Sequence, residues 1–399
     1  MKLLKRVSVR IFNFAMAGVE YLLKWREPRV LKSYNEMIDA FTLRDINNIL
    51  IVSDQNVYKY GLTKIIEEEL EKNDIDYSLF LDVTPNPTFK NVYNGVEVYK
   101  KNHCNGIIAV GGGSVMDCAK LIGVISTNGG TIEKYKGLFK VRHNMPKMVA
   151  FPTTSGTGSE TTIAAVVRNE TTGEKFPVES MRCVPRFAYL EPRLLLNLPP
   201  QVYATTGMDA LTHAIEAYLN FDTTKKTRKY ALDAILLIHN NLVLGYNNKD
   251  DLDAKSNMLY ASFLAGKAFT RSMVGNVHAI AHAIGGKYNL PHGYLNAIIL
   301  PYVLDLYKFK AKKKMSKIAN LIGVGLPNQS ELKNAESLIV YIRDLNKTFN
   351  LPEKIKEIKD EDISFLAKKS YKEAVPLYPC PVLFDENDFR KIYKSIQGE

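Results

Sequence analysis

A chain of 399 residues is longer than one hydrophobic core usually serves, so two domains are expected. Its content of 46% hydrophobic and 24% charged residues is ordinary for a globular protein. The cysteines are scattered without a CxxC pair, which argues against a disulfide framework and a thiolate zinc site and favours a cytoplasmic protein. They are Cys104, Cys118, Cys183 and Cys380.

The net charge of +11 does not indicate nucleic-acid binding, because much of it lies at one end. Residues 1–35 hold eight Lys or Arg against two Glu. A second basic run at residues 308–314 predicts a solvated helix face, with a phosphate-binding patch as the alternative. The chain has no zinc finger, aromatic RNA-binding motif or basic heptad array, so no nucleic-acid partner is expected.

The N-terminus is basic and then apolar, which has three interpretations. Val7, Ile11 and Phe14 fall near helical spacing, so a helical extension over about residues 1–30, packed on the protein or on a partner subunit, is favoured. A membrane-surface helix and a signal peptide are the alternatives. No stretch approaches about 20 apolar residues, so no membrane span is expected.

Residues 49–155 alternate short apolar runs with amphipathic segments, which is typical of βαβ units and a parallel sheet. Strands are predicted at 48–52, 77–81, 106–110 and 148–151, with helices at 62–73 and 91–102. After Pro200 the strand-like runs largely disappear and helical periodicity continues. We therefore expect an α/β Rossmann-like domain over residues 1–200 and an all-helical domain over residues 201–399.

Two donor-rich loops follow predicted strands. Gly111-Gly-Gly-Ser114 leads into a helix, and glycines there let the backbone approach a pyrophosphate beside a helix N-terminus. Pro152-Thr-Thr-Ser-Gly-Thr-Gly-Ser-Glu160 offers backbone and hydroxyl donors suited to phosphate or ribose. A plain turn explains either loop alone, whereas two loops at successive strand ends favour a nucleotide site.

The strongest pattern combines one aspartate with four of the seven histidines. Two pairs have i,i+4 spacing, which places each pair on one helix face, and a further histidine lies between Pro and Gly. Such a set can converge on a divalent ion with oxygen and imidazole donors that suit Fe(II) or Zn(II), although any single histidine is more often a core residue. The residues are Asp209, His213, His278, His282 and His292.

A cation beside a dinucleotide predicts alcohol oxidation. The cation lowers the pKa of an alcohol, hydride passes to the nicotinamide, and a nearby histidine carries the released proton.

These motifs closely resemble the iron-containing, or group III, alcohol dehydrogenases of the dehydroquinate-synthase-like fold. The resemblance covers about residues 48–395 and is carried by Pro85-Asn-Pro-Thr88, the two loops above, Gly207-Met-Asp-Ala-Leu-Thr-His-Ala-Ile-Glu216 and the His278 to His292 stretch. It implies hydride transfer between a nicotinamide dinucleotide and a small primary alcohol or aldehyde. It also implies a homo-oligomer, with a dimer favoured.

Site roles are likewise implied by the resemblance. Fe²⁺, with Zn²⁺ as the alternative, would be held by Asp209, His213, His278 and His292, while His282 would relay protons without binding the metal. Contacts to NAD, with NADP as the alternative, would come from Asp54, Asn86, Gly112, Gly113, Ser114, Asp117, Thr153, Thr154, Thr157 and Lys175.

The resemblance stops short of a substrate. Many relatives have Gly-Asn-Pro lining the substrate cleft, where this chain has Leu377-Tyr-Pro-Cys-Pro-Val382, so a bulkier and more apolar wall is expected. A polyol or sugar-phosphate enzyme of the same fold is one alternative, and a non-catalytic metal- or nucleotide-binding protein is another. Asp54 favours NAD, because an acidic residue after a strand accepts ribose hydroxyls and repels the extra phosphate of NADP. Its alternative role is to cap the following turn.

Overall fold

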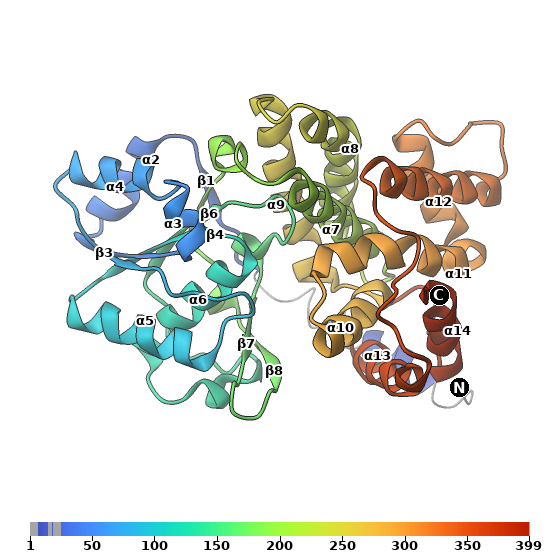
Figure 1. The fold of residues 1–399 in the computed structure, drawn as a ribbon, viewed down its shortest axis with the longest axis horizontal. Coiled ribbons are helices and arrows are strands. Elements are labelled where there is room, and N and C mark those ends of the chain that lie inside the picture. Colours follow the sequence, from blue (N-terminus) through green and yellow to red (C-terminus); the bar gives the residue numbers. More distant parts are fainter. Residues whose placement is uncertain (1–6, 15–17, 19–24, 399) are drawn as a thin grey trace. The chain divides into compact units, whose positions relative to one another are not determined.

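The computed structural model describes residues 7–14, 18 and 25–398, and the chain divides into two compact units (Figure 1). The α/β unit comprises Trp25–Leu198 and Lys249–Phe263. The helical unit comprises Pro199–Asn248 and Leu264–Glu399 together with the N-terminal segment. The predicted fold class, a parallel-sheet α/β domain followed by a helical domain, is confirmed.

The α/β unit is built on a six-stranded sheet in which every pair of neighbours is parallel. Its central strands are continuous apolar runs, as expected for strands that are buried on both faces. Across the sheet the order is β1 (Arg29–Leu31), β9 (Phe187–Tyr189), β6 (Lys147–Pro152), β4 (Gly106–Gly111), β2 (Asn48–Val52) and β3 (Asp76–Phe80).

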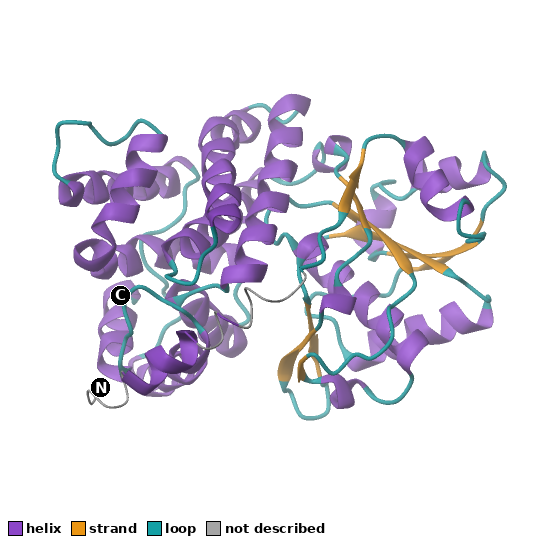
Figure 2. Cartoon of the chain, turned by 180° about the vertical axis from the view of Figure 1, so that it is seen from behind, coloured by secondary structure: helices purple, strands orange, loops and turns teal. Residues whose placement is uncertain are grey.

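Helices cover both faces of this sheet (Figure 2). Leu50 and Val52 of β2 pack with α5 (Phe89–Lys101) and α6 (Gly113–Asn128) on one face. Ile49 and Ile51, their neighbours in the strand, pack on the other face with the helices α2 (Tyr34–Thr42), α3 (Gln55–Lys59) and α4 (Lys64–Glu71). The period of two in the strand thus produces two hydrophobic cores.

Strand order also creates a switch point in the sheet. β2 lies between β3 and β4, so the chain leaves β2 toward one side of the sheet and returns to the other. In open α/β sheets, ligands bind beyond the carboxyl ends of the strands at such a point. The segments that follow Val52 and Gly111 occupy this position.

A small second sheet was not predicted. It joins β5 (Gly137–Leu138), β8 (Lys175–Glu179) and β7 (Ala164–Arg168) in that order. These strands are only two to five residues long, and β8 contains Pro177, which argues against a strand paired on both sides. The expected helical extension must also end before residue 29, where β1 begins.

The helical unit packs long helices around buried apolar stripes. Its elements are α7 (Pro200–Leu219), α8 (Lys225–Asn247), the second half of α9 (Leu252–Ser272), α10 (Asn276–Tyr288), α11 (His292–Leu321), α12 (Glu331–Thr348), α13 (Ile363–Leu377) and α14 (Glu386–Ile396). Short 3-10 turns occur at Ile132–Tyr135, Ser159–Thr161, Met181–Cys183, Pro192–Leu195 and Asp360–Asp362. Among the described helices, none combines the length and apolarity that crossing a bilayer requires.

The longest of these helices, α11, continues through a proline. Pro301 has no N–H, so the carbonyl oxygen of Ala297 one turn earlier loses its helical donor. Asn346 of α12 replaces it, because its Nδ2 donates to the Ala297 oxygen at 2.7 Å. A side chain from the neighbouring helix thereby satisfies the backbone at the break.

The basic run at residues 308–314 lies on α11, and its last member is not on a solvated face. Lys314 Nζ donates to the carbonyl oxygens of Tyr218, Leu219 and Asn220 at 3.0, 3.1 and 2.6 Å. These belong to the end of α7, where carbonyls lack helical donors and a cation is favourable. Burial, reinforced by Arg228, lowers the pKa of Lys314 to about 8. The prediction of a solvated face is therefore wrong for Lys314.

Residues 7–14 are helical and contact the helical unit. Arg10 donates to the carbonyl oxygens of Cys380 and Pro381 at 2.9 and 3.2 Å, and its guanidinium lies 4.7 Å from the ring centre of Phe221. Phe14 packs on the same ring. The remaining N-terminal positions of the predicted extension, 1–6, 15–17 and 19–24, lie outside the described residues.

The proline break predicts a measurable coupling between α11 and α12. Asn346→Ala should lower the free energy of unfolding by about 1–3 kcal/mol, because the Ala297 carbonyl is left without a donor. In a Pro301→Ala background the restored backbone N–H supplies that donor, so the same substitution should cost about 1 kcal/mol less. Urea unfolding of the four proteins measures this coupling, and equal costs in both backgrounds would contradict it.

Candidate active site

Four side chains from three helices of the helical unit converge on one point. Asp209 and His213 lie one turn apart on α7, His278 lies on α10, and His292 is the first residue of α11. The nitrogen or oxygen atoms that each could offer to a metal all lie within 4.8 Å of one another. Three of the residues are buried, whereas the His292 side chain is 40% exposed.

Two glycines let these helices approach each other closely. A Cβ at Gly293 would collide with the Thr205 carbonyl group of α7 and would lie 3.3 Å from the Cβ of Asp209. A Cβ at Gly275, just before α10, would lie 2.6 Å from Oε1 of Glu216. The clash at Gly293 is with backbone, so only a residue without a side chain fits there, whereas a side chain at Gly275 would displace the Glu216 carboxyl group. The two positions bring His292 and His278 against α7.

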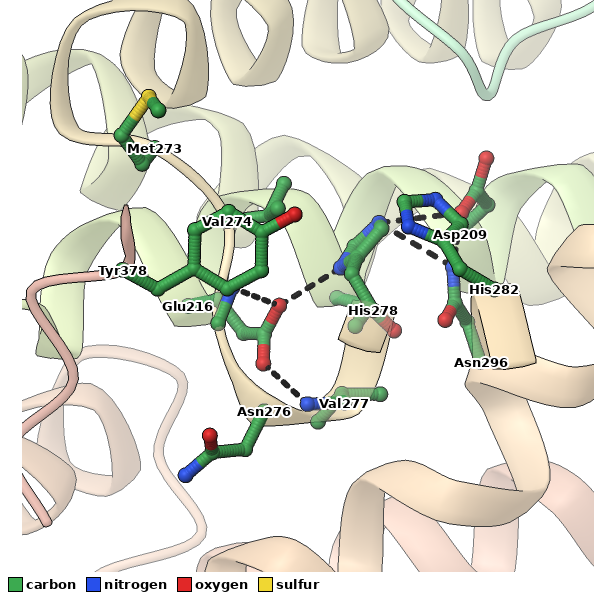
Figure 3. A network of polar contacts seen from close by, with 12 residues as sticks. Asp209, Glu216, Met273, Val274, Asn276, Val277, His278, His282, Asn296 and Tyr378 are labelled. Atoms are coloured by element: carbon green, nitrogen blue, oxygen red, sulfur yellow. Dashed lines mark hydrogen bonds and ion pairs between the residues drawn. The ribbon is translucent and has the colours of Figure 1, made fainter. Parts of the chain in front are cut away.

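Glu216 holds His278 in place (Figure 3). This buried carboxyl group accepts the Gly275 and Val277 backbone N–H groups, each at 2.7 Å, and its Oε2 lies 2.6 Å from His278 Nδ1. With the proton of His278 on Nδ1, the ring keeps a lone pair on Nε2, and this atom lies 3.9 Å from Asp209 Oδ1.

Burial governs the protonation of both groups. It lowers the pKa of His278 well below its ordinary value, and the neighbouring histidines lower it further. It raises the pKa of Glu216 to about 8, against the effect of the two backbone donors. His278 is therefore a neutral imidazole at neutral pH, which is the form that binds metals.

The side-chain amide of Asn296 lies between three of these four side chains. Its Nδ2 donates to Asp209 Oδ1 at 2.7 Å and also lies 3.2 Å from His278 Nε2 and 3.0 Å from His292 Nε2. One amide group, with two hydrogens, thus faces three acceptors on three different helices. The acceptors converge on a single small volume.

His282 lies beside this cluster and has partners of its own. It follows His278 by one turn of α10, and its ring stacks on that of His292 with centroids 5.2 Å apart. Its Nδ1 lies 2.7 Å from Oε1 of Glu373 on α13, and the Tyr378 hydroxyl donates to the same oxygen at 2.7 Å. Burial raises the pKa of Glu373, but His282 and the Tyr378 hydroxyl lower it more, so the net shift is downward.

The predicted nucleotide loops meet at the switch point of the α/β unit. α6 begins at Gly113 after Gly112, and no side chain caps its N-terminus. A Cβ at Gly112 would lie 3.5 Å from Thr154, and one at Gly113 would lie 3.0 Å from Thr157, so the loop after β6 packs directly on this turn. The Thr153 N–H donates to the Gly111 oxygen at 3.1 Å. Backbone N–H groups and hydroxyls therefore gather at one helix N-terminus.

A third loop joins them from the end of β3. Asn86 adopts a left-handed conformation with φ 57°, and its N–H donates to Ser114 Oγ at 3.3 Å. Its Oδ1 accepts from Lys175 Nζ at 2.8 Å. The structure thus places the amide, hydroxyl and ammonium groups of these three residues next to the glycine turn.

Two acidic residues expected to contact the dinucleotide have structural duties. Asp54 caps α3, because its Oδ1 accepts the Asn56 and Val57 N–H groups at 2.9 and 3.0 Å. The capping alternative therefore holds, while Asp54 Oδ2 accepts no hydrogen bond from the described residues. Asp117 accepts the Ser159 hydroxyl at 2.8 Å and the Val166 N–H at 3.0 Å, so both of its oxygens bind protein donors.

A buried lysine next to Asp117 was not anticipated. Lys120 Nζ donates to Ser159 Oγ, to Thr162 Oγ1 and its carbonyl oxygen, and to the Ala164 carbonyl, at 2.8–3.2 Å. Burial lowers the pKa of Lys120 and raises that of Asp117, whose Oδ1 lies 4.0 Å away. The Lys120 ammonium group therefore holds the end of the Thr/Ser-rich loop that follows β6.

Other residues missed from the sequence differ in how readily they could have been found. Glu216 follows His213 by three residues and Asn296 follows His292 by four, so helical spacing places both on the faces that carry the cluster. Glu373 and Tyr378 come from a distant helix and the segment after it, where no local pattern points to His282.

Comparison with known proteins gives this arrangement a family. The family model for iron-containing alcohol dehydrogenase matches residues 29–192, and the model for the C-terminal part of the Fe-containing alcohol dehydrogenase family matches residues 203–397. The boundary between the two models falls beside Pro199, where the helical unit resumes.

Individual relatives match over nearly the whole chain. The NAD-dependent methanol dehydrogenase of Bacillus methanolicus is 36% identical, with 87% of this chain and 91% of the relative covered. The 1,3-propanediol dehydrogenase of Citrobacter freundii is 38% identical, with 98% and 100% covered. A crystal structure of 1,3-propanediol oxidoreductase superposes with a TM-score of 0.90 at 33% identity, covering 94% of this chain and 99% of the other. The chain therefore belongs to the iron-containing alcohol dehydrogenase family.

Proposed function

We propose that the protein interconverts small primary alcohols and aldehydes with NAD(H), using one divalent metal ion held by Asp209, His213, His278 and His292. The observation that carries the proposal is the convergence of one carboxylate and three imidazoles, from three helices, within 4.8 Å. The family and its NAD-dependent relatives support the reaction class.

The donor set fits the metal that the family name implies. One carboxylate and three imidazoles, with no thiolate, suit Fe²⁺, and Zn²⁺ is the alternative. The Asn296 amide, which faces three of the four acceptors, further supports a cation at this point. The Glu216 carboxyl group would keep the His278 ring in the orientation for binding.

The glycine turn fits a dinucleotide. Gly112, Gly113 and Ser114 at the start of α6 would bind the pyrophosphate, with Thr153, Thr154 and Thr157 over the same helix N-terminus. Asn86 and Lys175 would contact the nucleotide from the side, and Asp117 would act through the Ser159 loop. Asp54 would accept a ribose hydroxyl through Oδ2, which favours NAD over NADP.

The residues of the metal cluster and His282 would have different roles in the reaction. When bound, the cation supplies Lewis acidity toward the alcohol oxygen, and the nicotinamide supplies the hydride acceptor. His282 would take the proton that the alcohol releases, because its ring lies against His292 and is 43% exposed to solvent. The buried Asp209, His213 and His278 exclude water from the inner side of the cluster.

The cellular compartment is inferred from the cysteines, and the oligomeric state from the family resemblance. All of the cysteines are free and buried, which supports a reducing cytoplasm. A homo-oligomer, with a dimer favoured, stays a prediction from the family resemblance.

The metal assignment predicts that one histidine of the cluster is indispensable. His278→Ala should abolish stoichiometric metal binding, because it removes a direct ligand. His239→Ala is the matched control, since His239 lies on α8 and bonds Tyr341. Elemental analysis of the two purified variants decides the matter, and metal retained by His278→Ala at the wild-type level would refute the assignment.

The proton role separates His282 from the ligands. His282→Ala should keep its metal and lose about 10²-fold in kcat, at the lower end of general acid–base effects because solvent reaches the site. Steady-state kinetics with elemental analysis on the same sample tests this. Loss of metal together with activity would make His282 a ligand.

The cofactor preference depends on Asp54. The wild-type protein should use NADH more efficiently than NADPH, and Asp54→Gly should raise kcat/KM for NADPH relative to NADH by removing a repulsive charge. Glycine costs only a few tenths of a kcal/mol at a helix N-cap, so α3 should persist. Asp45→Gly, at the opposite end of β2 and with φ 53°, is the control. A wild-type preference for NADPH would refute the assignment.

A further inference from the structure

We propose that Glu373, held by Tyr378, is a positioning residue that fixes His282 in the tautomer able to accept the alcohol proton. The inference rests on the proposed function and concerns residues outside the metal cluster. Glu373 Oε1 lies 2.7 Å from His282 Nδ1 and accepts the Tyr378 hydroxyl at 2.7 Å. A histidine ring beside a carboxylate that is itself anchored is the arrangement that orients a general base.

The chemistry of the pair sets the tautomer. An ionised carboxylate has no hydrogen to donate, so the 2.7 Å contact requires the proton to lie on Nδ1 of His282. In the neutral ring, Nε2 then carries the lone pair. No described residue forms a hydrogen bond with Nε2. The neutral His282 ring can therefore accept a proton only through Nε2.

Tyr378 restricts where the carboxylate can go. It donates to the same Oε1 that His282 contacts, and it comes from the segment after α13, while Glu373 lies within that helix. The carbonyls of Cys380 and Pro381 farther along this segment accept Arg10. The segment after α13 thus places a tyrosine hydroxyl on the carboxylate that contacts the proton carrier.

A simple structural bridge between α10 and α13 is the competing explanation. Glu373 would then stabilise the fold without acting through His282, and its loss would cost the same whether or not the imidazole is present. A double-mutant cycle separates the two explanations. The cycle uses the metal-loaded protein with Glu373→Gln, His282→Ala and the combined variant. The control is Glu361→Gln, an exposed residue in the 3-10 turn Asp360–Asp362.

Glutamine keeps the size of Glu373 but can donate as well as accept, so it no longer dictates the tautomer. Glu373→Gln should lower kcat by about 10–100-fold with KM changed less than about 2-fold, which is no more than the loss of about 10²-fold expected from removing the His282 base itself. In the His282→Ala background the same substitution should change kcat less than about 2-fold. Tyr378→Phe should cause a smaller loss in the same direction.

A spectroscopic readout on metal-free protein avoids dependence on activity. With ¹⁵N-labelled histidine and a neutral ring, the shifts of His282, assigned from the His282→Gln spectrum, should show the proton on Nδ1 in the wild type. Glu373→Gln should move population toward the Nε2–H tautomer, whereas Glu361→Gln should not.

An unchanged tautomer in Glu373→Gln, or an equal loss of kcat in both backgrounds, would overturn the proposal. If Glu373→Gln fails to fold, Tyr378→Phe is judged by the same two measurements. Wild-type turnover in His282→Ala would instead refute the proton role in the proposed function, and the tautomer spectra would still decide whether Glu373 sets the ring.

Discussion

The carboxyl group of Glu216 is the constraint on which the helical part of the site depends. It is buried on α7, two turns after Asp209, and collects two backbone N–H groups and one imidazole from the start of α10. Leaving one polar group of such a buried network without its partner typically costs about 1–3 kcal/mol, so sliding or rotating α10 along α7 would break several hydrogen bonds at once. The same carboxyl group therefore holds the start of α10 and the orientation of the His278 ring.

In the α/β unit a buried lysine orders a loop, as the Glu216 carboxyl group orders the start of α10 in the helical unit. The loop after β6 carries hydroxyls and glycines, which have little packing of their own to hold a conformation. Lys120 of α6 donates to two hydroxyls and two carbonyl groups at the end of this loop, and Asp117 accepts a hydrogen bond from the Ser159 hydroxyl. In both units a buried ionisable side chain, itself absent from the predicted reacting groups, orders the segment that carries them.

Features marked by a local sequence pattern could be predicted, whereas contacts between residues far apart in the sequence could not. The i,i+4 pairs at Asp209 and His278 and the glycines after a buried strand are local, so the fold class and a cluster of one aspartate and four histidines could be predicted. Spacing alone did not separate His282 from the four residues expected as ligands, and that distinction came from the family resemblance. The contact between Glu373 and His282 joins residues 91 positions apart. The sequence around Lys314 does not distinguish it from its exposed neighbours, because its hydrogen-bond partners belong to α7. The β5-β8-β7 sheet was missed because its strands are only two to five residues long and its central strand contains Pro177.

Helix α11 meets α7 at two separate places, through Gly293 against Thr205 and through Lys314 on the last carbonyls of α7. Each residue added to a helix advances it by about 1.5 Å and turns it by about 100°. One inserted or deleted residue between these contacts would turn one of them away from α7. Changes in chain length during evolution should therefore be absent from this stretch and should accumulate in the turn after α11, where Gly323 has open space around it.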